Sequence, residues 1–196
     1  MPPRKANLLF PSEAALLIID LQQAIDHPKW AKFGPRNNPQ AEANVKKLLE
    51  RWRKAQWPVY HIKHNSTDPK SPYRPRQPLN DFKPEVAPLP AETVVTKFTN
   101  SAFIGTDLED RLRNASHATL VIAGVITNNS VEATVRMAGN LGFAVFLAED
   151  ACFTFARKDW NGKLRNATEV HAMSLANLDR EYCKVVSTSK VLRAVS

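Results

Sequence analysis

The chain has 196 residues, which is enough for one α/β domain with a substantial core. Its formal net charge is +8, but the lysines and arginines are scattered and cluster only mildly over residues 46–54. No basic run is interleaved with aromatic residues, and no apolar run is long enough to cross a bilayer. These features exclude nucleic acid and membrane as expected partners and predict a basic surface that can attract anionic substrates.

The N-terminal residues bear on the cellular compartment, and the two cysteines bear on disulfide and metal chemistry. Residues 1–5 are basic, but the apolar run of a signal peptide does not follow them, so we expect a cytoplasmic protein. The two cysteines, Cys152 and Cys183, form neither a disulfide framework nor a closely spaced ligand pair. We expect both to be buried, unreactive thiols.

Strand and helix patterns alternate along the chain. Short apolar runs predict buried strands, and apolar residues at helical spacing predict amphipathic helices. The predicted strands are residues 14–20, 58–62, 93–97, 119–123, 144–148 and 184–188. The predicted helices are residues 39–55, 106–112, 130–140, 168–178 and 189–194. For the second helix we expect Thr106 as the N-cap, with Glu109 completing a capping box.

A proline-rich segment separates the second and third predicted strands. Residues 63–90 contain seven of the fourteen prolines, which makes the segment too irregular for a helix or a strand. Long ordered loops of this kind commonly carry function or form part of an interface.

The alternation of strands and helices predicts a parallel sheet with helices on both faces. In such sheets ligands bind outside the carboxyl ends of the strands. Asp20, Lys97 and the turn at residues 124–130 all lie at predicted carboxyl ends, so an acid, an amine and the Ser130 hydroxyl meet at one edge. Backbone amides at the start of the following helix make this turn a candidate oxyanion-binding site.

Short motifs near these strand ends occur in a distinctive order. They are Leu-Ile-Ile-Asp-Leu-Gln at 17–22, Thr-Lys-Phe-Thr-Asn-Ser-Ala-Phe at 96–103, Gly-Thr-Asp-Leu at 105–108, Gly-Val-Ile-Thr-Asn at 124–128, Glu-Asp-Ala at 149–151, Val-His-Ala at 170–172 and Ser-Leu-Ala at 174–176. In this order and spacing they resemble the isochorismatase-like superfamily, also called the cysteine hydrolases. The resemblance covers nearly the whole chain, so we expect a single domain over residues 1–196.

The resemblance implies a three-layer αβα fold with a six-stranded, mostly parallel sheet, commonly assembled as homodimers or homotetramers. It implies hydrolysis of a small amide or carbamoyl compound by a triad. Asp20 would be the general base, Lys97 would hold Asp20, and residue 130 would be the nucleophile. It also implies a non-proline cis peptide at Val125–Ile126 and an oxyanion hole formed by the amides of Ile126 and Ser130.

The chain departs from the family pattern at Ser130, which stands where the family has a cysteine. A thiol beside a lysine ionises readily, whereas a hydroxyl needs a well-aligned base. Ser130 is therefore a natural nucleophile, an introduced substitution, or a residue that takes part in no covalent step. The last case fits a vinyl-ether hydrolase of the isochorismatase type, although residues 127–129 resemble the amidase branch more closely. A catalytically silent small-molecule-binding homologue is a further alternative.

Loop residues around the predicted site are candidates for substrate binding, because aromatic side chains line small pockets and arginine binds carboxylates. The candidates are Phe33, His64, Arg74, Phe82 and Phe103. His171 lies in a helix pattern, and we expect it to make structural hydrogen bonds. The zinc-binding Asp-x-His pair of the family's nicotinamidase branch does not occur here, so we expect neither a catalytic metal nor another cofactor.

Overall fold

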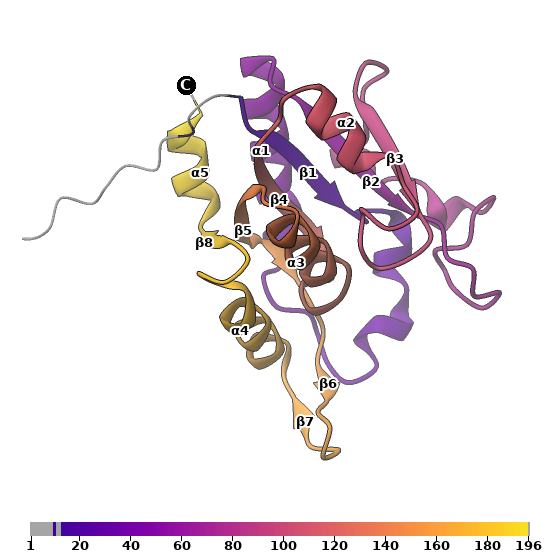
Figure 1. Cartoon of the computed structure of the whole chain (residues 1–196). Coiled ribbons are helices and arrows are strands. Elements are labelled where there is room, and N and C mark those ends of the chain that lie inside the picture. The colour runs from indigo at the N-terminus through magenta and orange to yellow at the C-terminus, as the bar shows by residue number, and fades with distance from the viewer. Residues whose placement is uncertain (1–9, 11–12, 196) are drawn as a thin grey trace, which may run out of the picture.

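The computed structural model describes residue 10 and residues 13–195. Residues 1–5, on which the expectation of a cytoplasmic protein partly rests, lie outside this range. The central sheet has six strands in the order β3-β2-β1-β4-β5-β8, and all of its neighbouring strands pair in parallel. Helices cover both faces of this sheet (Figure 1), so the predicted three-layer αβα fold is confirmed.

The predicted strands all occur, with some shifts in length. They are β1 (Ala15–Ile19), β2 (Val59–His64), β3 (Thr93–Lys97), β4 (Thr119–Val125), β5 (Ala144–Phe153) and β8 (Lys184–Val186). β1 lies in the middle of the sheet and is buried on both faces. Its side chains alternate between two cores, with Leu16 and Ile18 in one and Leu17 and Ile19 in the other.

The predicted helices also occur and divide between the two cores. They are α1 (Ala41–Ala55), α2 (Leu108–Asn114), α3 (Glu132–Asn140), α4 (Ala167–Leu178) and α5 (Thr188–Ala194). α1 and α5 contribute Trp52 and Val191 to the first core. α2, α3 and α4 contribute Leu112, Val135 and Leu178 to the second. Among the described residues, no helix combines the length and apolar character needed to span a membrane.

The start of α2 differs from the prediction. The N-cap is Asp107, so the expected capping box of Thr106 and Glu109 is wrong. The chain before α2 folds into turns, and the Thr106 hydroxyl donates to the carbonyl of Ala102 at 2.6 Å instead. A capping box forms at α4, where Asn166 and Glu169 each accept a hydrogen bond from the other's backbone amide.

Two further features differ from the predicted elements. β5 continues beyond residue 148 to Phe153, so the acidic residues Glu149 and Asp150 lie inside this strand. An unpredicted hairpin follows, formed by β6 (Arg157–Lys158) and β7 (Leu164–Arg165). Its strands are two residues long and mostly charged, so they lack the apolar alternation by which strands are recognised.

The proline-rich loop after β2 is tied to the end of β1 by amide side chains. Gln22, which is fully buried, donates to the carbonyls of His64 and Asn80 at 3.0 and 2.9 Å and accepts from the amide of His64. Asn80 donates to the carbonyl of Tyr73 at 2.8 Å, and Phe82 forms an isolated β-bridge with Gln22. These bonds hold the loop against the carboxyl edge of the sheet.

Gly124, near the end of β4, lies too close to β1 for any larger residue. Its φ is +123°, and an added Cβ would lie 2.2 Å from the carbonyl oxygen of Ile19. We therefore predict that Gly124→Ala lowers the free energy of unfolding by more than about 4 kcal/mol, or prevents folding. Gly142→Ala is the control: φ is +83° there but no atom lies within 4 Å, so a cost of about 1–2 kcal/mol is expected. Equal losses in urea titrations of the two variants would contradict this packing argument.

Candidate active site

Three strands carry the predicted triad to the same edge of the sheet. Asp20 directly follows β1, Lys97 is the last residue of β3, and Ser130 lies in the turn after β4. β1 and β4 are neighbours, but β2 separates β1 from β3. The Lys97 side chain therefore extends past the end of β2 to reach Asp20, and its length makes this contact possible.

The three side chains meet in a nearly closed site. Lys97 Nζ donates to Asp20 Oδ2 at 2.8 Å, to Ser130 Oγ at 3.3 Å and to the carbonyl of Thr99 at 3.0 Å. The exposed fractions are 4% for Asp20, 0% for Lys97 and 6% for Ser130. Charges shielded from water in this way interact more strongly than charges on the surface.

Burial dominates the electrostatics of Asp20. Desolvation raises the pKa of this carboxyl above 3.8, although the Lys97 ammonium and the Ser130 hydroxyl act in the opposite direction. Oδ1 of Asp20 is buried, and no described residue lies within hydrogen-bonding geometry of it. The carboxylate thus has one oxygen bound to Lys97 and one oxygen free to accept a proton.

The turn that carries Ser130 is irregular, and hydrogen bonds from side chains of α3 and α4 hold it in place. A cis peptide joins Val125 and Ile126, as the family resemblance implied, and the π-helical turn η5 (Thr127–Val131) follows. Thr127 Oγ1 lies 2.9 Å from Nδ1 of His171 on α4, which agrees with the structural role expected for His171. The carbonyl of Ser130 accepts from the Thr134 hydroxyl at 2.7 Å.

His64, at the end of β2, lies beside this group as a neutral side chain. Burial, assisted by the nearby Lys97 charge, lowers the pKa of His64 to about 4. Its Nδ1 is 3.5 Å from Lys97 Nζ, and its ring packs edge-to-face on Tyr73 with centroids 5.6 Å apart. His64 is therefore positioned to shape the site without adding positive charge at neutral pH.

This site and fold agree with a known family. The Isochorismatase domain family matches residues 14–188 of the chain. The chain belongs to the isochorismatase family. It is accordingly a member of the isochorismatase-like hydrolase superfamily, which confirms the resemblance inferred from the sequence motifs.

Individual relatives support this membership along almost the whole chain. The chain is 40% identical over 178 residues to YrdC, an uncharacterized isochorismatase family protein of Bacillus subtilis (strain 168), covering 91% of this chain and 94% of the relative. A solved isochorismatase-family structure from Chromobacterium violaceum ATCC 12472 is 60% identical, with a TM-score of 0.93 and 97% of each chain covered. Nicotinamidase 3 of Arabidopsis thaliana is 26% identical, covering 93% of this chain and 88% of the relative.

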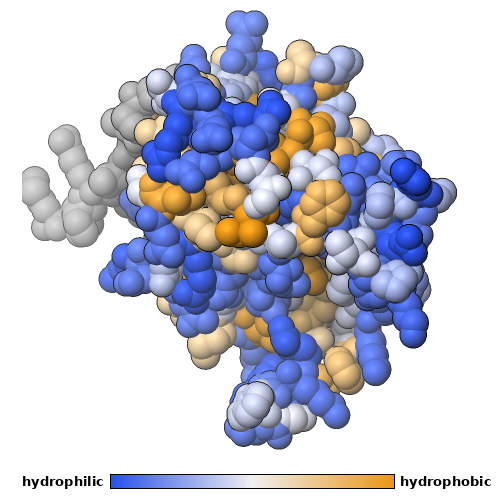
Figure 2. All heavy atoms as spheres, turned by 45° about the vertical axis from the view of Figure 1, so that its right-hand side comes forward, coloured by the Kyte–Doolittle hydropathy of each residue, from blue (hydrophilic) through white to orange (hydrophobic). Residues whose placement is uncertain are grey.

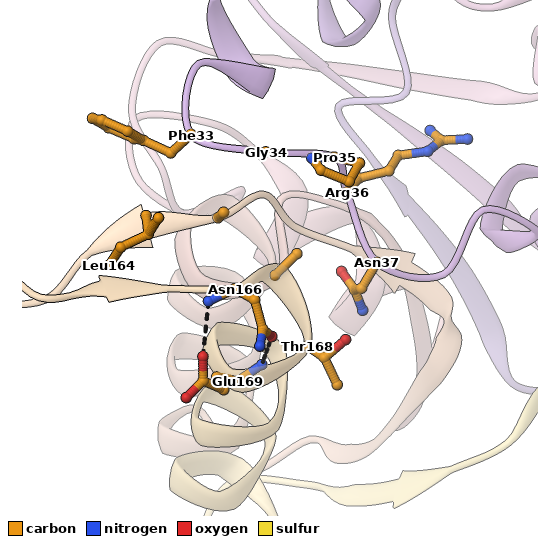
Figure 3. Close-up of a pocket in the computed structure, with 11 residues that line it drawn as sticks. Phe33, Gly34, Pro35, Arg36, Asn37, Leu164, Asn166, Thr168 and Glu169 are labelled. Atoms are coloured by element: carbon orange, nitrogen blue, oxygen red, sulfur yellow. Dashed lines mark hydrogen bonds between the residues drawn. The ribbon is translucent and has the colours of Figure 1, made fainter.

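Within this isochorismatase-family fold, the predicted substrate-binding residues are dispersed. Phe33 lines a separate pocket of about 430 Å³ between residues 33–37 and the start of α4 (Figure 3). Phe82 packs edge-to-face on His61, with centroids 5.7 Å apart. Arg74 is exposed. Phe103 is buried in the second core, where its ring stacks on Phe143.

The remaining sequence-based expectations concern metal ligands and thiols. Within residues 10 and 13–195, no group of three histidine, cysteine or acidic residues is arranged to hold a metal ion. Cys152 and Cys183 are both buried and free, as predicted. Burial raises the pKa of the Cys183 thiol to about 12 and that of Cys152 further, so neither is a ready nucleophile.

Sequence reasoning did not assign the groups that support the triad. The Tyr73 hydroxyl donates to the Asp20 carbonyl at 3.1 Å, and Gln22 and Thr99 anchor the neighbouring loop and the Lys97 ammonium. In the sequence, Tyr73 is one aromatic residue within the proline-rich loop, and nothing there marks it as a partner of Asp20. Thr99 acts through its carbonyl oxygen, for which no side-chain signal exists.

Lys97→Met tests the buried ion pair independently of any substrate. Removing the ammonium leaves a buried carboxylate without a counter-ion, so we expect a loss of about 3–5 kcal/mol of unfolding free energy at pH 7. The pKa of Asp20 is already above 3.8, and the loss of the ammonium raises it further. The loss of stability is therefore smallest below pH 3.8, where the carboxyl group is protonated. It grows as the pH rises toward the higher pKa of the variant.

Adding Asp20→Asn to Lys97→Met should restore most of the lost stability at pH 7, because the uncompensated charge is then absent. Denaturant titrations at several pH values measure both effects. A loss that is the same at every pH, or that Asp20→Asn does not relieve, would contradict the ion-pair account.

Proposed function

We propose that this hydrolase cleaves the C–N bond of a small amide or carbamoyl compound, with Ser130 as the nucleophile. The observation that carries the proposal is the buried contact of Lys97 Nζ with both Asp20 Oδ2 and Ser130 Oγ, at 2.8 and 3.3 Å. A hydroxyl, a base and a cation in one hydrogen-bonded group meet the requirements of nucleophilic catalysis. The similarity to a plant nicotinamidase supports an amide substrate.

In the first half of the reaction, Ser130 Oγ attacks the carbonyl carbon and its proton passes to Asp20. The amides of Ile126 and Ser130 bind the resulting oxyanion, since an oxyanion hole supplies donors where negative charge develops. The C–N bond then breaks, and Asp20 returns the proton to the leaving nitrogen. The products of this half are a free amine or ammonia and an acyl-Ser130 ester.

In the second half, water replaces the amine. Asp20 removes a proton from the water, whose oxygen attacks the acyl carbon. The ester bond to Ser130 breaks, and the serine regains its proton from Asp20. The Lys97 ammonium, held by Asp20 and by the carbonyl of Thr99, stabilises the carboxylate and the developing alkoxide.

The site supports serine as the nucleophile through the basicity of Asp20. A carboxylate in water is a weak base for a hydroxyl, but burial raises the pKa of Asp20 and brings its basicity closer to that of a useful general base. The Lys97 ammonium acts in the opposite direction and favours the carboxylate form. A raised pKa makes the Asp20 carboxylate a stronger base than that of an exposed aspartate.

Ammonia release from a panel of small amides and ureides tests the proposal. We expect turnover by the chain as it stands, and at least about 10³-fold lower kcat for Asp20→Ala and for Ser130→Ala. Ser189→Ala, which removes an exposed hydroxyl from α5, is the control and should retain full activity. Full activity of Ser130→Ala together with loss in Asp20→Ala would instead indicate hydrolysis without a covalent intermediate.

The pH dependence of kcat/KM reports the base of the free enzyme. Because Asp20 acts as a carboxylate and burial raises its pKa, activity should rise with pH through a midpoint above 3.8. His64 has a pKa of about 4, so a matched His64→Gln variant distinguishes its titration from that of Asp20. A midpoint that disappears in His64→Gln would show that the histidine, and not Asp20, controls the acid limb.

A further inference from the structure

The backbone of Asp20 departs from the strand that carries it. Its φ is +51°, a left-handed conformation that residues other than glycine adopt uncommonly, although aspartate tolerates it better than most. Residues in such conformations cluster at functional sites, and they persist only where the surrounding structure holds them. The turn at Asp20, directly after the last residue of β1, is therefore a feature that needs both a purpose and a support.

This turn decides which face of the sheet the Asp20 carboxylate reaches. Along β1, Ile18 lies in the first core and Ile19 in the second, so an extended residue 20 would direct its side chain to the side of the first core. Lys97 lies two residues after Val95 on β3, and Val95 belongs to the second core. The left-handed backbone breaks the alternation at Asp20, and the carboxylate meets Lys97 Nζ at 2.8 Å.

Three hydrogen bonds hold the Asp20 backbone in this conformation. The amide of Asp20 donates to the carbonyl of Ile62 on β2 at 3.0 Å, and the carbonyl of Asp20 accepts from the amide of Gln22 at 2.8 Å. The third bond comes from the proline-rich loop, where the Tyr73 hydroxyl donates to the same Asp20 carbonyl at 3.1 Å. Tyr73 lies 53 residues away in the sequence, so this bond ties the turn to a distant part of the chain.

Tyr73 is itself held firmly on the inner side of its loop. The loop lies on the right-hand side of Figure 1, and the same side, turned forward in Figure 2, presents a mainly hydrophilic surface. Tyr73 is only 6% exposed, so it does not belong to that outer surface. Its ring packs edge-to-face on both Trp30 and His64, with centroids 6.0 and 5.6 Å away, and its carbonyl accepts from Asn80 Nδ2 at 2.8 Å. A fixed ring thus presents the hydroxyl to Asp20.

We propose that Tyr73 is a positioning residue for the general base, because it restrains Asp20 in the left-handed conformation that directs the carboxylate to Lys97 and Ser130. This inference rests on the proposed function, in which Asp20 exchanges a proton with Ser130. The Tyr73 hydroxyl acts through the backbone of Asp20, whereas the carboxylate itself is bonded by Lys97. Since small displacements of a reacting group lower the rate of reaction steeply, a loosened turn slows the chemical step and leaves substrate binding intact.

Tyr73→Phe tests this role, because it removes the hydroxyl and keeps the ring that packs on Trp30 and His64. We expect kcat on an amide substrate to fall at least about tenfold while KM stays nearly unchanged. Tyr60→Phe is the matched control: it makes the same substitution at another buried tyrosine, whose ring packs on His117, and it should retain full kcat. A merely structural role would lower the stability of Tyr73→Phe without this selective loss of kcat.

Amide hydrogen exchange measures the restraint without any substrate. The amides of Asp20 and Gln22 make the two backbone hydrogen bonds of the turn, so loosening the turn exposes both amides to water. We expect both to exchange at least about tenfold faster in Tyr73→Phe than in wild type, and at the wild-type rate in Tyr60→Phe. The amide of Val45, inside α1, is the internal reference and should exchange equally in all three proteins.

Two kinetic results would overturn the proposal where the wild type is active. They are an unchanged kcat in Tyr73→Phe, and a raised KM at unchanged kcat, which would place the tyrosine against the substrate. Unaltered exchange at Asp20 and Gln22 would overturn it whether or not the wild type is active. A wild type that cleaves no amide or ureide contradicts the proposed function, and faster exchange in Tyr73→Phe would then still support the restraint on Asp20.

Discussion

The buried pair of Asp20 and Lys97 is the interaction around which the carboxyl edge of the sheet is built. Removing both charges from water costs several kcal/mol per ion, and the pair persists only where good geometry and further hydrogen bonds compensate. The fold supplies both, because the strand order places β1 and β3 one strand apart and the Lys97 side chain spans that gap. The carbonyl of Thr99 accepts a further hydrogen bond from the Lys97 ammonium.

Two independent parts of the chain position the groups that act with this pair. The proline-rich loop, bound by Gln22 and Asn80, brings Tyr73 against Asp20, and the end of β2 places His64 beside Lys97. On the other side, α4 and α3 hold the turn that carries Ser130. The base is thus fixed by β1 and its loop, and the nucleophile by β4 and the helices. A change in α4 would therefore displace the hydroxyl without disturbing the ion pair.

Regular elements and their order could be predicted from the sequence because apolar periodicity reports burial directly. The runs at Leu16–Ile19 and in β4 are continuous and apolar, as strands buried on both faces must be. Phe103 and the hairpin show the limit of this reasoning. An aromatic residue beside a site carries no signal of whether it faces the pocket or the core, and a two-residue charged strand has no period.

The meeting of Asp20, Lys97 and Ser130 at one edge could be predicted because they lie at or just beyond the carboxyl ends of β1, β3 and β4. Their roles as a triad were implied by the family resemblance. Their hydrogen-bond pattern could not be predicted, since it depends on side-chain packing within the loops. The most direct test of the account is peptide mass spectrometry after reaction with a fluorophosphonate, a reagent for activated serines. The account predicts a single adduct on Ser130 that Asp20→Asn abolishes. Labelling that Asp20→Asn leaves unchanged, or that occurs elsewhere, would contradict it.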